Sequence, residues 1–212
     1  DDSLEQIIEP LNLNLATNYS RAAFSDTNGN LLFASNGWRL VNSTGEILSY
    51  KLWRNEMPHP DDSPDTTMLL VTLGPLFLND PGDNSKAYLF YGEYDPAYEY
   101  SPPNNYTIPA DIFFSYAYLD IPTQSLIGQE NTVLSTPTQN GNMQACRHAN
   151  GRDWWVIKPG IYQNSFYIGL LDPNGLSMQE VIIPGITANI QARTFSQFSF
   201  NGDKFVHFAV FP

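Results

Sequence analysis

The chain has 212 residues, of which 42% are hydrophobic, 14% aromatic and 15% charged, so it can bury a sizeable core and is not a disordered polymer. Its formal net charge of −12 argues against nucleic acid and anionic membranes as partners, because both require a basic surface. The single cysteine, Cys146, excludes an intrachain disulfide and a zinc site built on two or four cysteines. No stretch approaches the roughly 20 apolar residues of a transmembrane helix, so we expect no membrane insertion.

Short apolar runs separated by turn residues dominate the chain, and helical periodicity is weak. This pattern predicts antiparallel hairpins. We expect the strands in four consecutive groups, at about 19–25, 30–36, 38–42 and 46–52; 67–74, 86–95, 111–121 and 125–134; 143–149, 152–158, 164–172 and 176–184; and 195–200 and 203–210. The Pro-rich acidic segments 55–65 and 96–109 are predicted to be long surface loops.

A glycine-containing turn recurs between the expected strands. The first lies at Asp26–Asn30, where Asn28-Gly29 supplies the positive φ that a tight hairpin needs. Related turns are expected at Ser43–Gly45, Asn150–Arg152, Asp172–Gly175 and Asn201–Asp203. The recurrence indicates a structural repeat.

Four small sheets in succession predict an all-β chain folded as an incomplete β-propeller of about three and a half blades. We expect one domain over 1–212, with sheets at about 19–52, 67–134, 143–184 and 195–210. Each sheet is too small to bury both of its faces alone, so stacking on its neighbours would complete the core. A Greek-key sandwich is the alternative, and it predicts no repeated hairpin signature.

Three hairpins carry a resemblance to a known family. Residues Ala23–Phe33 resemble the hairpin that opens the propellers of secreted Bacteroidetes proteins, and Arg147–Ile157 (RHANGRDWWVI) resembles a segment found further along in them. Residues Phe198–Phe205 are similar to the corresponding hairpin of WD-repeat-like and TolB-like propellers. The family comprises secreted or cell-surface β-propellers associated with gliding motility or type IX secretion.

The resemblance implies a secreted or cell-surface location and a chain that is part of a longer protein, since propellers of this family need about 300 residues or more. An open arc would leave two sheet faces uncovered. We therefore expect a homo-oligomer, formed when a second copy pairs with an open face.

The segment that most resembles the family also carries charged and aromatic residues. His148, Asn150 and Gly151 are assigned to the structural motif of the turn, as are Arg152, Asp153, Trp154 and Trp155. The resemblance implies an Arg152–Asp153 pair that locks the turn, with Trp154 and Trp155 on opposite faces. The alternative is that Arg152, Asp153 and Trp154 bind a ligand.

A second candidate site lies in the Tyr- and acid-rich stretch 88–120. Its candidate binding residues are Tyr91, Glu93, Tyr94 and Asp111. Such residues could line a carbohydrate groove or supply the facing carboxylates of a glycosidase. No paired catalytic motif is recognisable, so no catalytic residue is assigned.

Other chemistry is weakly indicated. Cys146 and His148 share a strand face, but structural roles explain both. Asp26 and Asn28 begin a segment like a calcium loop, in which Gly37 stands where the closing Glu should be. We expect no metal and no cofactor.

The sequence therefore favours a non-enzymatic interaction or scaffold module of a secreted or surface-exposed bacterial protein, with a protein or glycan partner of unknown identity. The alternatives are a carbohydrate-binding or glycoside-hydrolysing propeller that uses residues of 88–120, and a structural repeat without a ligand.

Overall fold

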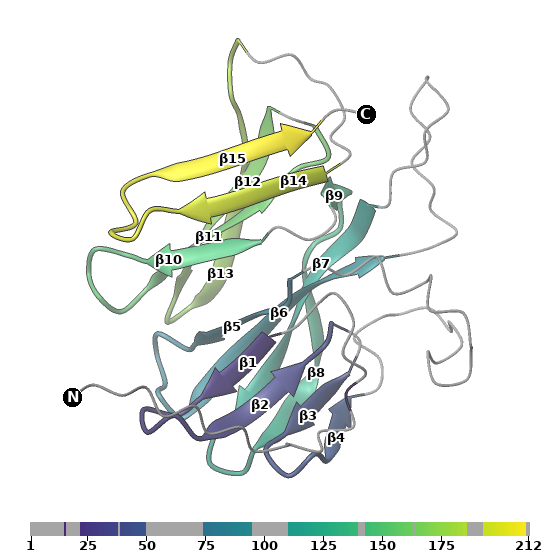
Figure 1. Cartoon of the computed structure of the whole chain (residues 1–212), viewed down its shortest axis with the longest axis vertical. Coiled ribbons are helices and arrows are strands. Elements are labelled where there is room, and N and C mark those ends of the chain that lie inside the picture. The colour runs from purple at the N-terminus through teal and green to yellow at the C-terminus, as the bar shows by residue number, and fades with distance from the viewer. Residues whose placement is uncertain are drawn as a thin grey trace, which may run out of the picture.

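The computed structural model describes Leu15 and residues 22–37, 39–49, 74–94, 110–139, 143–162, 164–185 and 193–210. These residues form strands and turns with no helix among them, which confirms the all-β class (Figure 1). Within this part of the chain there is accordingly no helix that could cross a membrane.

The strands form four consecutive antiparallel sheets in chain order. The first sheet contains β1 (Ala22–Ser25), β2 (Leu31–Ser35), β3 (Leu40–Asn42) and β4 (Ile47–Ser49). The second contains β5 (Leu76–Asn79), β6 (Lys86–Tyr94), β7 (Ala110–Asp120) and β8 (Ser125–Leu134), and β9 (Thr138–Gln139) pairs with β7. The third contains β10 (Gln144–Arg147), β11 (Trp154–Pro159), β12 (Ser165–Asp172) and β13 (Gly175–Ile182). The fourth contains β14 (Arg193–Phe198) and β15 (Phe205–Val210).

The predicted strand groups agree with these sheets except in the second. Its first strand, β5, begins at Leu76, after the predicted range of 67–74. Residues 67–73 lie outside the described part of the chain. The short strand β9 was not predicted, because its two residues pair with β7 and carry no pattern of their own.

The second sheet is apolar on both faces, because alternate residues of a strand point to opposite sides. Leu89 and Ala117 face the first sheet, where they pack in one core cluster with Phe33. Phe90 and Phe114 face the third sheet and pack in a second cluster with Val156 and Leu171, among others. The second sheet is therefore the central layer between its two neighbours.

The fourth sheet packs on the other face of the third. The ring of Phe166 lies edge-on to Phe205 and His207, with centroids 6.0 and 5.0 Å apart. On the same side, Cys146 Sγ lies 4.0 Å from the carbonyl oxygen of Gly202. The four sheets thus form a face-to-face series in chain order.

Equivalent strands of successive sheets lie against one another. The first strands β1 and β5 are in contact, as are β10 and β14, and the fourth strands β4, β8 and β13 form a second line of contacts. The first three sheets therefore complete their cores on one another. The propeller itself stays a prediction.

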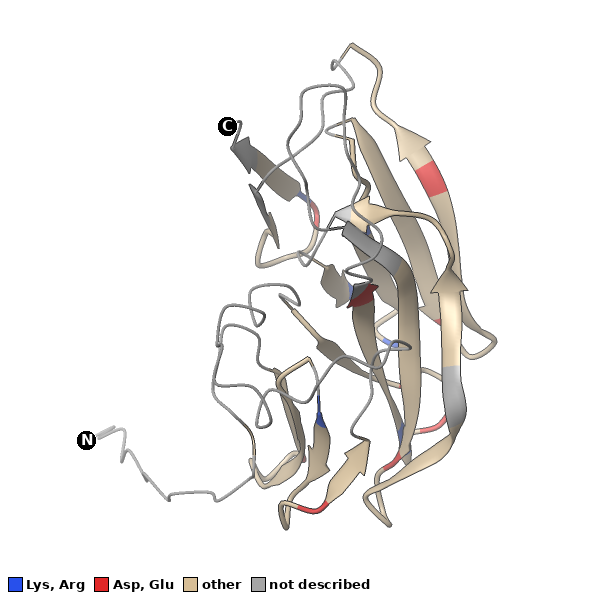
Figure 2. Cartoon of the chain, turned by 90° about the vertical axis from the view of Figure 1, so that its right-hand side faces the viewer, with Lys and Arg blue, Asp and Glu red and all other residues tan. Residues whose placement is uncertain are grey.

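Among the described residues, charged side chains are few along the strands and lie mainly at the turns (Figure 2). In each four-stranded sheet, the turn between the first and second strands and the turn between the third and fourth lie at the same end of the strands, because neighbouring strands are antiparallel and consecutive in the chain. The last residues of β6 and β8 lie at the opposite end. This arrangement separates the two candidate sites: the Arg152–Asp153 turn lies at the first end, and Tyr91 and Glu93 lie toward the other, near the end of β6.

Candidate functional site

The β10–β11 turn is closed by hydrogen bonds among its own residues. The amide of His148 donates to the Asp153 carbonyl oxygen at 2.9 Å, and the amide of Gly151 donates to the His148 carbonyl oxygen at 2.9 Å. Asn150 Oδ1 accepts from the amides of Arg152 and Asp153, each at 3.0 Å. Gly151 has a φ of 73°, which a side chain would disfavour.

The carboxylate of Asp153 is buried inside this turn. Arg152 Nε donates to Oδ1 at 2.7 Å, and Oδ2 accepts from Arg152 Nη2 at 3.2 Å and from Asn150 Nδ2 at 2.6 Å. The Arg152 guanidinium is the main cause that lowers the pKa of Asp153. Both oxygens of Asp153 are therefore engaged by the turn itself, which is the arrangement of a structural lock.

The two tryptophans that follow lie on opposite faces of the third sheet. Trp154 packs in the cluster shared with the second sheet, and its Nε1 donates to the Asn79 carbonyl oxygen at 3.1 Å. The guanidinium of Arg147 lies 3.8 Å from the Trp154 ring centroid. Trp155 is on the other face, 39% exposed, with its ring 5.4 Å from that of His148. Trp154 therefore anchors one sheet on the next.

The same turn recurs in the fourth sheet between β14 and β15. The amide of Ser199 donates to the Lys204 carbonyl oxygen at 2.9 Å, and the amide of Gly202 donates to the Ser199 carbonyl oxygen at 2.9 Å. A shorter version at the β1–β2 turn uses the Asp26 carboxylate, which accepts from the amides of Asn28 and Asn30 at 2.9 and 2.8 Å. The β1–β2, β10–β11 and β14–β15 hairpins are thus closed by similar hydrogen bonds within the turn.

The β5–β6 hairpin of the second sheet has a different set of hydrogen bonds, and its turn contains a buried carboxylate, that of Asp80. Asp80 Oδ1 accepts from the Gly82 amide at 2.7 Å, and the Tyr118 hydroxyl donates to Asp80 Oδ2. Burial, with a smaller effect of the Asp80 charge, raises the pKa of Tyr88 to about 12. Burial and the bond to Asp80 raise the pKa of Tyr118 well above its ordinary value. Both phenols are therefore neutral structural groups at pH 7.

The candidate residues of the Tyr-rich stretch do not share one surface. Tyr91 and Glu93 are buried, 1% and 2% exposed, on the face of β6 that meets the first sheet. Ser115 Oγ donates to Glu93 Oε1. The backbones of Tyr94 and Asp111 pair across β6 and β7. Tyr91 and Glu93 therefore do not line an open groove, and they lie far along the sheet from the Arg152–Asp153 turn.

The weaker candidates also have local explanations. Burial raises the pKa of the Cys146 thiol, and His148 Nδ1 accepts from the Asn150 amide at 3.2 Å. The Asp26 carboxylate is filled by amides of its own turn, including Asn30 Nδ2 at 2.9 Å. No group of three or more His, Cys, Asp or Glu among the described residues could hold a metal ion.

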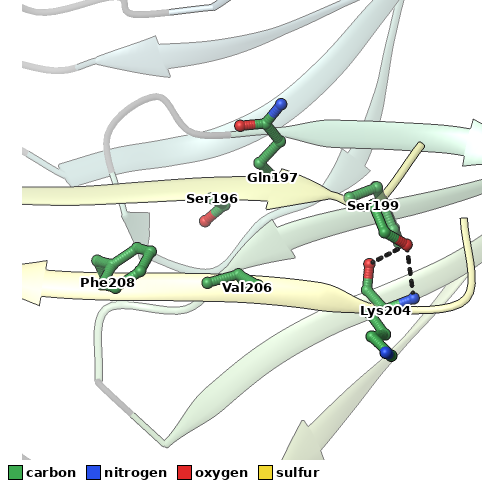
Figure 3. Close-up of a pocket in the computed structure, with 7 residues that line it drawn as sticks. Ser196, Gln197, Ser199, Lys204, Val206 and Phe208 are labelled. Carbon is green, nitrogen blue, oxygen red and sulfur yellow. Dashed lines mark hydrogen bonds between the residues drawn. The ribbon is translucent and has the colours of Figure 1, made fainter.

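Sequence reasoning missed the outer face of the fourth sheet. Val206 is 46% and Phe208 65% exposed there, and Gln197 lies opposite Val206 in the β14–β15 register. These residues help to line a shallow pocket of about 560 Å³ (Figure 3). The signal that could have found it is the uncharged run of β15, Phe-Val-His-Phe-Ala-Val, in a chain of net charge −12.

Comparison of the chain with protein-family models, with curated proteins and with solved structures finds no match in any of the three. The family resemblance therefore rests on the three hairpin motifs alone.

Proposed function

We propose that this chain is a non-enzymatic interaction and scaffold module whose contact surface is the outer face of the fourth sheet. The observation that carries the proposal is the exposure of Val206 and Phe208 beside a pocket at the end of the series of sheets. Large exposed apolar side chains on one face mark interaction surfaces.

The hydrogen bonds of three carboxylates support structural roles for these acidic residues. Asp153, Asp80 and Asp26 accept hydrogen bonds from amides and side chains of their own turns or neighbouring strands. A glycosidase needs two carboxylates that face a common cleft. The resemblance of the hairpins supports a module of a secreted or surface-exposed bacterial propeller.

The partner that we propose for this face is a second copy of the chain. The first three sheets pack through largely apolar faces, and Gln197, Val206 and Phe208 form an uncharged part of the outer face, beside which Lys204 also lines the pocket. Two such faces can meet, because the acidic groups of the described residues lie mainly at the turns (Figure 2). Within the described part of the chain this sheet has two strands, so the contact between two such faces is small and the pairing weak.

Light scattering after size exclusion, over a range of protein concentrations, tests this pairing. We expect the mass to rise toward twice the monomer mass, and Phe208→Asp to hold the chain at the monomer mass. Phe200→Asp is the matched control, because Phe200 is exposed at the turn of the same hairpin. A monomer at every concentration, or an equal effect of Phe200→Asp, would count against this contact surface.

A glycan array and a panel of chromogenic glycosides test the carbohydrate alternative. We expect neither binding nor hydrolysis. Hydrolysis that is abolished by Glu93→Gln or Asp111→Asn, in protein that keeps its fold, would overturn the non-enzymatic proposal.

A further inference from the structure

Asn-Gly pairs recur at the hairpin turns, and four of them have the same backbone arrangement. The glycine of each pair has a positive φ, between 72° and 107°. The amides of Gly29, Gly151 and Gly202 donate to the carbonyl oxygen three residues earlier at 3.1, 2.9 and 2.9 Å, and Gly175 pairs with Asp172 in the β12–β13 ladder. Because the backbones are alike, the asparagine side chains are what distinguishes these turns. The four pairs are Asn28-Gly29, Asn150-Gly151, Asn174-Gly175 and Asn201-Gly202.

An asparagine followed by glycine can lose its side-chain amide without an enzyme. The backbone nitrogen of the glycine gives its proton to the solvent and attacks Cγ of the asparagine, and ammonia leaves. Water then opens the resulting cyclic imide at either of its two carbonyl carbons, which yields aspartate or isoaspartate. Glycine favours the ring closure because it has no side chain to hinder the approach. The reaction consumes water, releases ammonia and needs no other reactant.

The side chain of Asn150 is held away from this reaction by three hydrogen bonds. Its Oδ1 accepts from the amides of Arg152 and Asp153, each at 3.0 Å, and its Nδ2 donates to Asp153 Oδ2 at 2.6 Å. These bonds must break before Cγ can turn toward the nitrogen of Gly151. Each broken bond adds to the barrier, so the β10–β11 turn protects Asn150.

The next two asparagines are each restrained by a single feature. Asn201 Oδ1 accepts from Ser199 Oγ at 2.9 Å. Asn174 Nδ2 makes only a long hydrogen bond of 3.4 Å to the carboxylate of its own turn. The preceding residue, Pro173, packs against Gly82 of the second sheet, where an added Cβ would lie 3.1 Å from Pro173 Cβ. This contact limits the opening of the β12–β13 turn, so we expect intermediate reactivity at both asparagines.

The side chain of Asn28 is the least restrained of the four. Asn28 and Gly29 are both exposed. Asp26 Oδ1 binds the backbone amide of Asn28 at 2.9 Å, whereas the side-chain amide of Asn28 interacts only weakly with Asp26, as the smallest of the causes that lower the pKa of that carboxyl. Cγ of Asn28 can therefore turn toward the nitrogen of Gly29 once the 3.1 Å hydrogen bond from Gly29 to Asp26 opens.

We propose that Asn28-Gly29 is a site of spontaneous deamidation in the folded protein, and that the fold protects Asn150-Gly151 from the same reaction. The product places a new carboxylate beside Asp26 in the β1–β2 turn. Its isoaspartate form also lengthens the main chain of that turn by a methylene group. The site lies on the first sheet, so this inference does not depend on the contact surface proposed for the fourth.

Incubation of the whole chain in mildly alkaline buffer, with and without urea, tests the proposal, and peptide mass spectrometry measures the deamidated fraction at each asparagine. In the folded protein we expect Asn28 to react about tenfold faster than Asn150 or more, because only Asn150 must break several side-chain hydrogen bonds. In urea the two sites should react at comparable rates, since the restraints are lost. Equal rates at the two sites in the folded protein, or reaction of Asn28 in urea alone, would overturn the inference.

Ser199→Ala provides a second readout at another turn of the same kind. This variant removes the hydrogen bond to Asn201 Oδ1 and leaves the β1–β2 turn as it is. We expect deamidation of Asn201 to become about threefold faster in the folded variant, while the rate at Asn28 stays the same. An unchanged rate at Asn201, in protein that keeps its circular dichroism spectrum, would contradict the assignment of these rates to side-chain hydrogen bonds.

Discussion

The Asp120 carboxylate, at the β7–β8 turn, is surrounded by donors. Lys86 Nζ forms an ion pair with it, and Thr123 donates from its amide at 2.9 Å and from Oγ1 at 2.8 Å. These contacts, with Lys86 the largest cause, lower the pKa of Asp120 to about 2. Because the unfolded pKa is about 3.9, the stabilisation is present above about pH 4 and is lost as pH falls toward 2.

We therefore expect the free energy of unfolding to decline from about pH 4 to pH 2 in the wild type, and Asp120→Asn to be less stable at pH 7 and to decline less over that range. Urea unfolding at a series of pH values measures both quantities. Lys86→Gln should make the decline smaller and end it at a higher pH, since it removes the main cause of the low folded-state pKa. Equal slopes in the wild type and Asp120→Asn would contradict this assignment.

For single residues, the sequence predicts the partner of a side chain only where the two residues are close in the chain. The Arg152–Asp153 pair was predictable because adjacent residues at a glycine turn can reach each other. The burial of Tyr91 and Glu93 was not predictable, since β6 is covered on both faces and shows no alternation of polar and apolar residues. Their side chains are placed by contact with the first sheet, which is distant in sequence.

At the scale of the element, Gly169 on β12 allows β13 to approach closely. A Cβ at this position would lie 2.6 Å from Met178 Cγ and 2.7 Å from the Ser177 carbonyl oxygen. The Met178 side chain can move, but the Ser177 backbone is held in the β12–β13 ladder. We expect Gly169→Ala to lower the free energy of unfolding by about 1–3 kcal/mol.

Chemical denaturation measures this loss, and Ser177→Ala is the control. Ser177 is exposed on the other face of β13, so its truncation should change stability by less than about 0.5 kcal/mol. An unchanged midpoint in Gly169→Ala would show that the two strands can separate without cost at this point.

The hairpins were predictable because their chemistry is local. Gly29, Gly151 and Gly202 each provide a positive φ at a first hairpin, and the neighbouring polar side chains close the turn. β5 was misplaced because it follows a long acidic connection without a turn signal of this kind.

At the scale of the whole molecule, the layers depend on one another. Phe33 belongs to the cluster between the first and second sheets, and Phe90 belongs to the cluster between the second and third. Both side chains are fully buried. Because the second sheet contributes residues to both clusters, a cavity in one cluster also weakens the sheet on which the other cluster depends.

We expect Phe33→Ala and Phe90→Ala each to lower the free energy of unfolding by about 3–5 kcal/mol while unfolding stays a single transition. In a background in which Trp38, Trp53 and Trp155 are replaced by Phe, tryptophan fluorescence reports on Trp154 between the second and third sheets. Its midpoint should equal that of far-ultraviolet circular dichroism, which reports on all strands. Phe200→Ala is the control and should leave the midpoint unchanged, since its ring is fully exposed. If Phe33→Ala instead gave an early transition in circular dichroism that fluorescence did not follow, the first sheet would unfold alone, and the layers would not form one cooperative unit.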